Sequence, residues 1–360
     1  MSGNSTGERV LMKGNEAIAE AAIRAGCTAY FGYPITPQNE LIGYMASHLP
    51  EKGRVFIQAE SETAAINMVY GAAACGVRAM TSSSSPGISL KQEGISYAAG
   101  ADLPLVYVNI VRGGPGLGSI APAQSDYFQS TRGGGHGDYH VVVLAPDSVQ
   151  EAADLTYEAF DIADEWRMPV MILGDGVIGQ MMEGIVLPPE RDLSSLPPKD
   201  DWKVGNMEGR EARHITSIHL VPAELEQLVF ERFERYRRLA ESLARHEETG
   251  CGDADVVLVA YGTSARVCRS AIERAAAEGL KLGLFRPVTL WPFPSKELAR
   301  VARRGVPLLS VEMSMGQMVE DIRLAVGSSA PVHLLPHAGG VVPTDDEIVA
   351  RCRDILGGTK

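Results

Sequence analysis

Short apolar runs alternate with helix-like stretches along the first half of the chain, and this alternation restricts the fold more than any other feature. The apolar runs predict strands at residues 28–31, 54–58, 79–81, 105–111, 141–145 and 169–173. The stretches between them predict helices at residues 39–48, 61–75, 88–98 and 149–166. Strand, helix and strand at this spacing indicate βαβ units and a mainly parallel sheet, that is, an α/β fold.

The pattern changes after about residue 186. Residues 187–202 contain four prolines and alternating charges, which predict a linker, and residues 221–248 predict a long charged helix. The alternation then resumes, with strands predicted at residues 256–261, 280–285, 307–311 and 332–335. We therefore expect a first domain at residues 1–187, a linker and bridging helix at 188–250, and a smaller α/β domain at 251–360.

Composition and charge exclude several classes of function. Hydrophobic residues make up 45% of the chain, which is typical of a globular protein. The formal net charge of -12 argues against nucleic acid or an anionic membrane as a partner, because phosphate binding needs clustered Lys and Arg. The five cysteines are scattered without a Cys-x-x-Cys pair, so we expect neither disulfides nor a metal or iron–sulfur site built by this chain alone. Without an apolar segment typical of a signal peptide or a bilayer span, a cytoplasmic location is expected.

Three loops at the predicted carboxyl ends of strands carry polar side chains, and ligands of open parallel sheets bind there. The first loop is Gly-Tyr-Pro-Ile-Thr-Pro at residues 32–37. We expect Thr36 to cap the next helix and Pro37 to take its first position, so that free N–H groups and a hydroxyl face the strand ends. A capped turn without further function is the alternative.

The second loop holds two carboxylates, Glu60 and Glu62, where a strand passes into an apolar helix. An acidic residue in the first helical turn often only complements the helix dipole. Glu62, however, is followed by small apolar residues that can bury it, and a buried carboxyl can exchange a proton near neutral pH. The residues alone leave both interpretations open.

The third loop begins at Arg112, directly after the strand predicted at residues 105–111, and continues as Gly-Gly-Pro-Gly-Leu-Gly. An arginine at the end of a strand is well placed to bind a substrate carboxylate through two hydrogen bonds. A solvated arginine in a flexible loop is the alternative. The glycine-rich stretch does not fit Gly-x-Gly-x-x-Gly and no helical pattern follows it, so we reject a dinucleotide site.

Three further features carry weaker signals. Gly-Asp-Gly at residues 174–176 is typical of the start of the metal–diphosphate motif of thiamine enzymes, but the asparagines expected further along are missing, and we interpret it as a turn after a strand. His136 and His140 lie in glycine-rich sequence without a third ligand, so no metal site is expected. Residues 81–87 include four serines, which favour capping of the next helix over a phosphate site.

The three loops, in this order, resemble those of the α subunit of the 2-oxoacid:ferredoxin oxidoreductases. Stretches of the second half also resemble that family: Tyr-Gly-Thr-Ser at 261–264, Arg-Pro at 286–287, Trp-Pro-Phe-Pro at 291–294 and Glu-Met-Ser-Met-Gly-Gln at 312–317. The resemblance covers nearly the whole chain; Ser314 departs from it, where many members have Asn. It implies a thiamine-diphosphate-binding-type parallel sheet domain that binds the pyrimidine, followed by a smaller transketolase C-terminal-like α/β domain.

The resemblance also implies roles for single residues. Glu62 would pair with N1′ of the aminopyrimidine of thiamine diphosphate and promote formation of the reactive cofactor. Thr36 would hydrogen-bond the substrate near its carbonyl, and Arg112 would hold its carboxylate or the adjacent site. The catalytic residues would thus be Glu62, Thr36 and Arg112, the cofactor-binding residues Pro34, Ile35, Thr36 and Glu62, and the substrate-binding residues Thr36, Arg112 and Gly113.

The activity that the resemblance implies is oxidative decarboxylation of a 2-oxoacid with coenzyme A, which yields acyl-CoA, CO2 and reduced ferredoxin. A β subunit would carry the diphosphate-binding domain, and a γ subunit, a ferredoxin-like δ subunit or both would complete a dimer of heteromers. Mg2+ and [4Fe-4S] clusters would lie on these partners. The absence of a metal–diphosphate motif and of cluster cysteines fits this division.

The substrate follows less directly from the loop after Arg112. Residues 113–118 with Ala-Pro-Ala-Gln at 121–124 resemble members acting on branched-chain 2-oxoacids such as 3-methyl-2-oxobutanoate. Members acting on 2-oxoglutarate often have a Ser-Thr pair in this loop, and no Lys or Arg stands nearby here to receive a second carboxylate. A 2-oxoglutarate enzyme is one alternative, and a transketolase-type or decarboxylase-type thiamine subunit without electron transfer is another.

Overall fold

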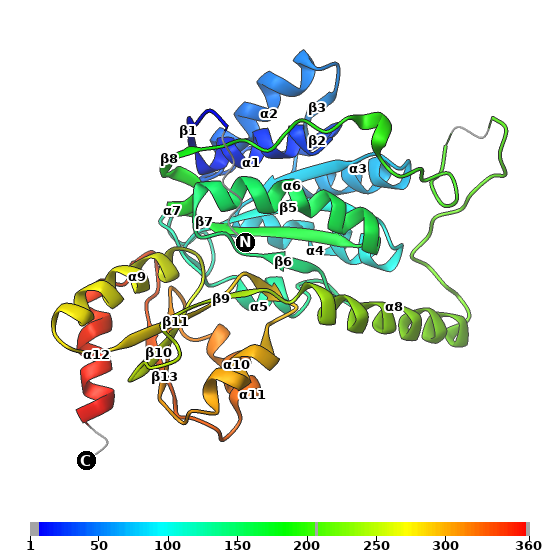
Figure 1. Ribbon diagram of the computed structural model, residues 1–360. Helices are drawn as coiled ribbons and strands as arrows, with labels where there is room; N and C mark the ends of the chain where they lie inside the picture. Colours follow the sequence, from blue (N-terminus) through cyan, green and yellow to red (C-terminus); the bar gives the residue numbers. More distant parts are fainter. Residues whose placement is uncertain (1–6, 206–207, 358–360) are drawn as a thin grey trace.

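Three β-sheets organise the chain, in a computed structural model that describes residues 7–205 and 208–357 (Figure 1). The first half contains β1 (Val10–Lys13), α1 (Gly14–Arg24), β2 (Ala29–Gly32), α2 (Asn39–Glu51), β3 (Val55–Gln58), α3 (Glu62–Ala74), β4 (Ala79–Ser83), α4 (Ser85–Gly100), β5 (Leu105–Val111), α5 (Tyr127–Thr131), β6 (Val142–Leu144), α6 (Val149–Trp166), β7 (Pro169–Asp175), α7 (Gly176–Gln180) and β8 (Met182–Ile185). The second half contains a 3-10 turn (Leu193–Ser195), α8 (Pro222–Leu243), β9 (His246–Thr249), β10 (Val256–Val259), α9 (Gly262–Ala277), β11 (Leu282–Pro287), β12 (Thr289–Trp291), α10 (Ser295–Ala302), β13 (Leu308–Glu312), α11 (Met318–Val326), β14 (Val332–Pro336) and α12 (Asp345–Gly357). None of these helices combines the length and the apolar character that a membrane span requires.

The largest sheet has the strand order β12-β6-β7-β5-β4-β2-β3, and every pair except β12 with β6 is parallel. The strands predicted in the first half are all present, as β2 to β7, which confirms the mainly parallel sheet. All residues of β5 and β7 are buried, as expected for central strands covered on both faces. One face packs against α1, α2 and α6, and the other against α3 and α4.

The second half of the chain forms a five-stranded sheet in the order β14-β13-β10-β11-β9, and it also completes the first sheet. Strand β12 pairs antiparallel with β6, so residues expected in the second domain supply an edge strand to the first. The prediction of one helix over residues 221–248 is wrong at its end, because α8 stops at Leu243 and β9 pairs with β11 instead. A two-stranded sheet of β1 and β8 was not predicted.

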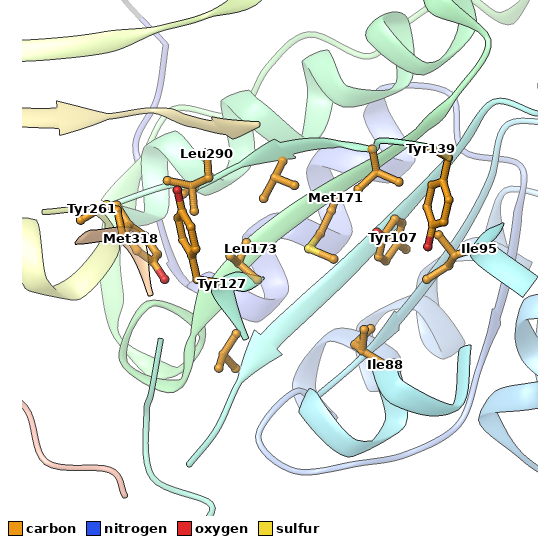
Figure 2. Packing of buried hydrophobic residues seen from close by; sticks show 14 of the residues in the cluster. Ile88, Ile95, Tyr107, Tyr127, Tyr139, Met171, Leu173, Tyr261, Leu290 and Met318 are labelled. Atoms are coloured by element: carbon orange, nitrogen blue, oxygen red, sulfur yellow. The ribbon is translucent and has the colours of Figure 1, made fainter. Parts of the chain in front are cut away.

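A continuous hydrophobic core runs from the first domain into the second. Figure 2 shows it from Ile88 and Ile95 of α4, past Tyr107 and Met171 of the central strands, to Tyr127, Tyr261 and Met318. The rings of Tyr127 and Tyr261 lie with centroids 6.0 Å apart across the boundary. Because one core serves both domains, their relative placement is fixed by close packing as well as by hydrogen bonds.

Asp175, interpreted from the sequence as part of a simple turn, joins the two domains. It ends β7 and caps α7, and its Oδ1 accepts hydrogen bonds from the backbone of Val177 and Ile178 at 2.9 and 3.2 Å. The same carboxylate accepts from the hydroxyl and the backbone N–H of Thr263, at 2.7 and 3.2 Å. Burial raises the pKa of Asp175, and these four donors oppose that shift.

We predict that Asp175→Ala lowers the free energy of unfolding by about 2–4 kcal/mol, because a helix cap and two bonds to the second domain are lost together. Thr263→Val, which removes only one hydroxyl donor at nearly constant volume, is the matched variant and should cost about 1 kcal/mol. Urea unfolding of the full chain measures both values. Equal losses for the two variants would contradict a joint role of Asp175 in capping and docking.

Candidate active site

Four neighbouring parallel strands end at the same edge of the large sheet, in the order β3, β2, β4 and β5. Residues that the sequence singled out lie at these four ends: Glu62 after β3, Thr36 after β2, the serine run at the end of β4 and Arg112 directly after β5. The strand order therefore brings the three predicted loops to one place, as ligand sites of open parallel sheets require.

The loop after β2 is held in place from several sides, although not as predicted. Helix α2 begins at Asn39 with Gln38 at its N-cap, so the prediction of Thr36 as N-cap and Pro37 as first helical residue is wrong. The cis Thr36–Pro37 peptide lies before the helix, and Pro37 O accepts a hydrogen bond of 2.8 Å from Asn15 Nδ2. The hydroxyl of Thr36 accepts from Asn39 Nδ2 at 3.3 Å and stays partly exposed.

Arg112 connects the loop after β2 with its own loop. Its Nη1 donates to Thr36 O at 3.0 Å and its Nη2 to Leu117 O at 3.4 Å. The side chain is buried, and its Nε has no hydrogen-bond partner among the residues that the structure describes. The interpretation as a solvated arginine is therefore wrong, and Thr36 and Arg112 lie together as predicted. Three N–H donors of the guanidinium are left for a ligand, since arginine carries five and two are used.

Glu62 begins α3 and is buried, with 7% of its surface exposed. Ser61 caps the helix by accepting from Ala64 N at 3.2 Å, which fixes the direction in which the first turn starts. A Cβ placed on Gly87 of α4 would lie 2.6 Å from Glu62 Oε1, so the bare α-carbon of a glycine is what leaves room for the carboxylate. The apolar helix thus buries Glu62 as expected, in the first turn where a negative charge is also favoured by the helix dipole.

The serine run lies between Glu62 and Arg112 and does not cap α4 in the predicted way. Ser84 is the N-cap residue, but its hydroxyl makes no capping bond; instead Ser85 N donates to Asn109 Oδ1 at 3.1 Å. Ser85 Oγ contacts Arg112 by accepting from its backbone N–H at 3.1 Å. The hydroxyls of Ser83 and Ser84 are buried without a partner among the described residues. Two buried hydroxyls of the serine run therefore keep hydrogen-bonding capacity that the described residues do not use.

The other predicted residues occupy the rim of the same site. Pro34 is exposed and Ile35 is partly buried. Gly113 is buried. A Cβ added to it would lie only 3.1 Å from the backbone of Gly339 in the second domain. Gly113 thus allows close packing of the two domains beside Arg112.

Gln124, which the sequence did not single out as a site residue, links the loop of Arg112 to the second domain. Its Oε1 accepts from Ser264 Oγ at 2.9 Å and from Met313 N at 3.1 Å, while its Nε2 donates to Tyr261 O at 2.8 Å. Its backbone N–H donates to Met313 O at 2.9 Å. Gln124 is thus bound by residues of two stretches that were noted in the sequence, 261–264 and 312–317. No sequence pattern around Gln124 itself signals this role.

A buried carboxylate organises the stretch 312–317. Glu312 accepts from the hydroxyls of Ser310 and Ser314, both at 2.7 Å, and from three backbone N–H groups at the start of α11. The negative charge at a helix N-terminus is stabilised by these donors and by the helix dipole. Gln317 then reaches the first domain by accepting from Phe128 N at 2.8 Å.

Within residues 7–205 and 208–357, no three His, Cys, Asp or Glu side chains gather in a way that would hold a metal ion. His140, one of the two histidines considered from the sequence, stacks on Trp291 with ring centroids 4.4 Å apart, and burial lowers its pKa. It therefore belongs to an aromatic contact between β12 and the first domain.

Comparison with known proteins agrees with this geometry. Residues 20–242 match the family described as pyruvate flavodoxin/ferredoxin oxidoreductase, thiamine diphosphate-binding, and residues 254–348 match pyruvate:ferredoxin oxidoreductase core domain II. The chain is 51% identical over 348 residues to ketoisovalerate oxidoreductase subunit VorB of Methanothermobacter thermautotrophicus, covering 96% of this chain and 98% of that one. It is 36% identical to 2-oxoglutarate synthase subunit KorA of the same organism, covering 95% and 97%.

Two solved structures share the fold. The 2-oxoglutarate:ferredoxin oxidoreductase from Magnetococcus marinus, with 2-oxoglutarate, coenzyme A and succinyl-CoA bound, superposes with a TM-score of 0.85 at 29% identity; the match covers 97% of this chain but 65% of that chain. A split-gene transketolase superposes with a TM-score of 0.59 at 14% identity, covering 96% and 98%, which is a likeness of fold alone. These matches confirm a thiamine-diphosphate-binding-type domain followed by a transketolase C-terminal-like domain. The chain therefore belongs to the 2-oxoacid:ferredoxin oxidoreductase family, as a member that carries the thiamine-diphosphate-binding domain and core domain II.

Proposed function

We propose that this chain is the pyrimidine-binding catalytic subunit of a ferredoxin-dependent 2-oxoacid oxidoreductase that acts on a branched-chain substrate such as 3-methyl-2-oxobutanoate. The observation that carries the proposal is the convergence of Glu62, Thr36 and Arg112 at one sheet edge, with Arg112 bonded to Thr36 O. The 51% identity to a ketoisovalerate oxidoreductase subunit over nearly the full length supports the substrate class.

The residues around Glu62 fit the aminopyrimidine of thiamine diphosphate. A buried carboxylate beside a glycine α-carbon offers an acceptor where little surface is exposed. The nearby hydroxyl of Ser83, which has no partner among the described residues, offers a donor. Glu62 would hold a proton at N1′, and a charge-assisted hydrogen bond of this kind is strong where water is excluded. Thiamine diphosphate, when bound, supplies the nucleophilic carbon that attacks the 2-oxo group. Pro34 and Ile35 would border the pyrimidine from the loop after β2.

Arg112 and Thr36 would bind the substrate. The guanidinium is fixed by two backbone carbonyls, so its remaining N–H groups are oriented before a carboxylate arrives. The hydroxyl of Thr36, one residue from the rigid Pro37, would donate to the 2-oxo oxygen. Fixing both groups in advance reduces the entropy lost when the substrate binds in a reactive orientation.

The surroundings of Arg112 favour an apolar substrate side chain. Leu117 and Ile120 present exposed aliphatic side chains from the loop that follows Arg112. Residues 113–124 contain no Lys or Arg that would pair with the second carboxylate of 2-oxoglutarate. Because relatives at 34–39% identity are 2-oxoglutarate synthase subunits, 2-oxoglutarate is the alternative substrate.

The proposal includes partners that complete the site. A β subunit would bind the diphosphate with Mg2+, and [4Fe-4S] clusters on it or on a γ or δ subunit would carry electrons to ferredoxin. Coenzyme A would accept the acyl group, and it is bound in the related structure from Magnetococcus marinus. We propose the cytoplasm as the location; the five cysteines are free thiols, which suits a reducing compartment.

Replacing Glu62 by Gln tests the role of the carboxylate. We predict that Glu62→Gln, in the complex assembled with its partner subunits, lowers kcat by about 10²–10⁴-fold, because proton exchange at the pyrimidine is lost. Glu60→Gln, at the exposed carboxylate two residues before, is the control and should keep normal turnover. Steady-state kinetics with ferredoxin give kcat, and gel filtration shows whether each complex is assembled. Near-normal turnover of Glu62→Gln in an intact complex would refute the assignment.

Substitution of Arg112 tests substrate binding. We predict that Arg112→Lys raises the KM for the 2-oxoacid about 10–100-fold, since lysine keeps the charge but loses the planar pair of donors. Arg132→Lys is the control, because Arg132 is exposed and pairs with Asp321 away from the site. An unchanged KM in Arg112→Lys would exclude Arg112 from carboxylate binding.

Measurements on the full chain and on the assembled complex test the proposed substrate and the proposed partners. We predict that the full chain alone neither binds thiamine diphosphate tightly nor reduces an acceptor, and that the complex with an iron–sulfur partner prefers 3-methyl-2-oxobutanoate over 2-oxoglutarate by at least about 10-fold in kcat/KM. Isothermal titration and a panel of 2-oxoacids measure these quantities. A preference for 2-oxoglutarate would establish the alternative substrate, and a complex without clusters would favour a transketolase-type enzyme.

A further inference from the structure

A fully buried lysine lies on α4, the helix that packs against Glu62 of α3, and has no part in the proposed chemistry. Lys91 of α4 has 0% of its surface exposed, and its Nζ donates one hydrogen bond of 2.9 Å to Thr81 Oγ1. Lysine is almost never fully buried without a compensating partner, because desolvation of an ammonium group is unfavourable. The neutral hydroxyl of Thr81 supplies no charge, so the ammonium form of Lys91 needs a counter-charge from another residue.

The packing of α3 against α4 directs Lys91 towards Glu62. Residues 87, 91 and 94 share one face of α4, since positions four and seven apart lie on the same side of a helix. On that face, a Cβ at Gly87 would meet Glu62 at 2.6 Å, and one at Gly94 would meet Ile66 at 2.7 Å. Lys91 therefore sits between two glycines that touch the first two turns of α3. Long helical side chains lean towards the N-terminus, which for Lys91 means towards Gly87 and Glu62.

Side chains of β4, in the sheet beneath α3 and α4, complete the surroundings of Lys91 and Glu62. Thr81 and Ser83 are two residues apart on β4 and so point to the same face. Ser83 lies under Gly87, and Thr81 holds the ammonium of Lys91. Ser82, in contrast, points to the other face, where its hydroxyl contacts Tyr30 and Gln38. One buried polar column thus runs from Glu62 and Ser83 to Lys91 and Thr81.

The charges of Lys91 and Glu62 interact. Burial lowers the pKa of Lys91 to about 7, and the charge of Glu62 opposes this shift. Tyr107 of β5 pairs with Thr81 in the sheet register, and burial raises its pKa well above the ordinary value, so it stays neutral. The charge facing Lys91 from α3 is therefore Glu62, and β4 and β5 face it with neutral groups.

We propose that Lys91 is a positioning residue, whose buried ammonium group supplies the counter-charge of the Glu62 carboxylate and orients that carboxylate beside Gly87. The inference rests on the proposed role of Glu62 and adds to it a residue that does not touch the substrate. An opposite charge in the protein interior attracts the carboxylate strongly and so restricts the positions that the carboxylate can take. Without Lys91, the desolvated carboxylate would lose its counter-charge.

The first experiment needs no cofactor and uses the full chain. Urea unfolding is measured for Lys91→Met, Glu62→Gln and the double variant, with Lys91→Gln as a second replacement if Lys91→Met does not fold. We expect the shift of the double variant to differ clearly from the sum of the single shifts, because the two groups interact. Gln92→Met, a buried polar replacement on the neighbouring position of α4, should combine additively with Glu62→Gln. Additive shifts for Lys91 as well would overturn the proposal.

The pH dependence of the same unfolding gives a second readout. The folded lysine loses its proton near pH 7, whereas the unfolded lysine keeps it to about pH 10.4. The unfolded state therefore binds more protons in this window, and the stability of the wild type relative to Lys91→Met rises from pH 7 to about 10. A difference that stays constant over this range would contradict a buried, titrating Lys91.

The third readout separates this inference from the proposed function. In the assembled complex, we expect the acid limb of the kcat profile of Lys91→Met to move to higher pH by about one unit, because removing a nearby positive charge favours the neutral form of a carboxyl group. Gln92→Met should keep the wild-type profile. If Glu62→Gln is inactive while Lys91→Met keeps the wild-type profile, the role of Lys91 fails and that of Glu62 stands. If Glu62→Gln retains full turnover, the proposed function itself fails.

Discussion

Parallel pairing of β3, β2, β4 and β5 is the constraint on which the candidate site depends. Thr36 and Arg112 are 76 positions apart and form a hydrogen bond because the strands before them, β2 and β5, end at the same sheet edge with only β4 between them. The register also decides which face each side chain reaches, since a shift of one residue would exchange the environments of Ser82 and Ser83. The position of Glu62 against Gly87 therefore depends on the pairing of the whole sheet.

The second domain makes the loop after β5 rigid although it supplies none of the three predicted catalytic side chains. Arg112 begins that loop, and Gln124 near its end is held by three bonds from its side-chain amide to the second domain. Between them, Gly113 packs on the backbone of Gly339. A loop fixed at both ends presents the arginine with little loss of entropy on binding, which is how remote contacts contribute to a site.

The predicted elements agree best with the structure where local sequence signals and burial coincide. The bounds of β5 and α6 match the prediction, because β5 is one uninterrupted apolar run and Ser148 caps a helix with a regular apolar face. It was wrong for Thr36 as N-cap, and it missed β12, whose pairing partner β6 is distant in sequence. Asp175 looked like a turn because its partner Thr263 lies 88 residues away. Lys91 and Gln124 were missed, since the burial of a polar residue is decided by tertiary contacts; the spacing of Gly87 and Gly94 was the available signal for Lys91.

The close approach of α3 and α4 has two effects that cannot be separated. Glycines at 87 and 94 let the helices meet without intervening side chains, which removes water from around Glu62. The same removal makes an isolated carboxylate unfavourable and strengthens its attraction to any nearby cation. A carboxylate shielded from water at this position is therefore stabilised by a buried positive group nearby. On the face that carries the two glycines, positions 90 and 91 lie between them; Leu90 is exposed, so the buried position is that of Lys91.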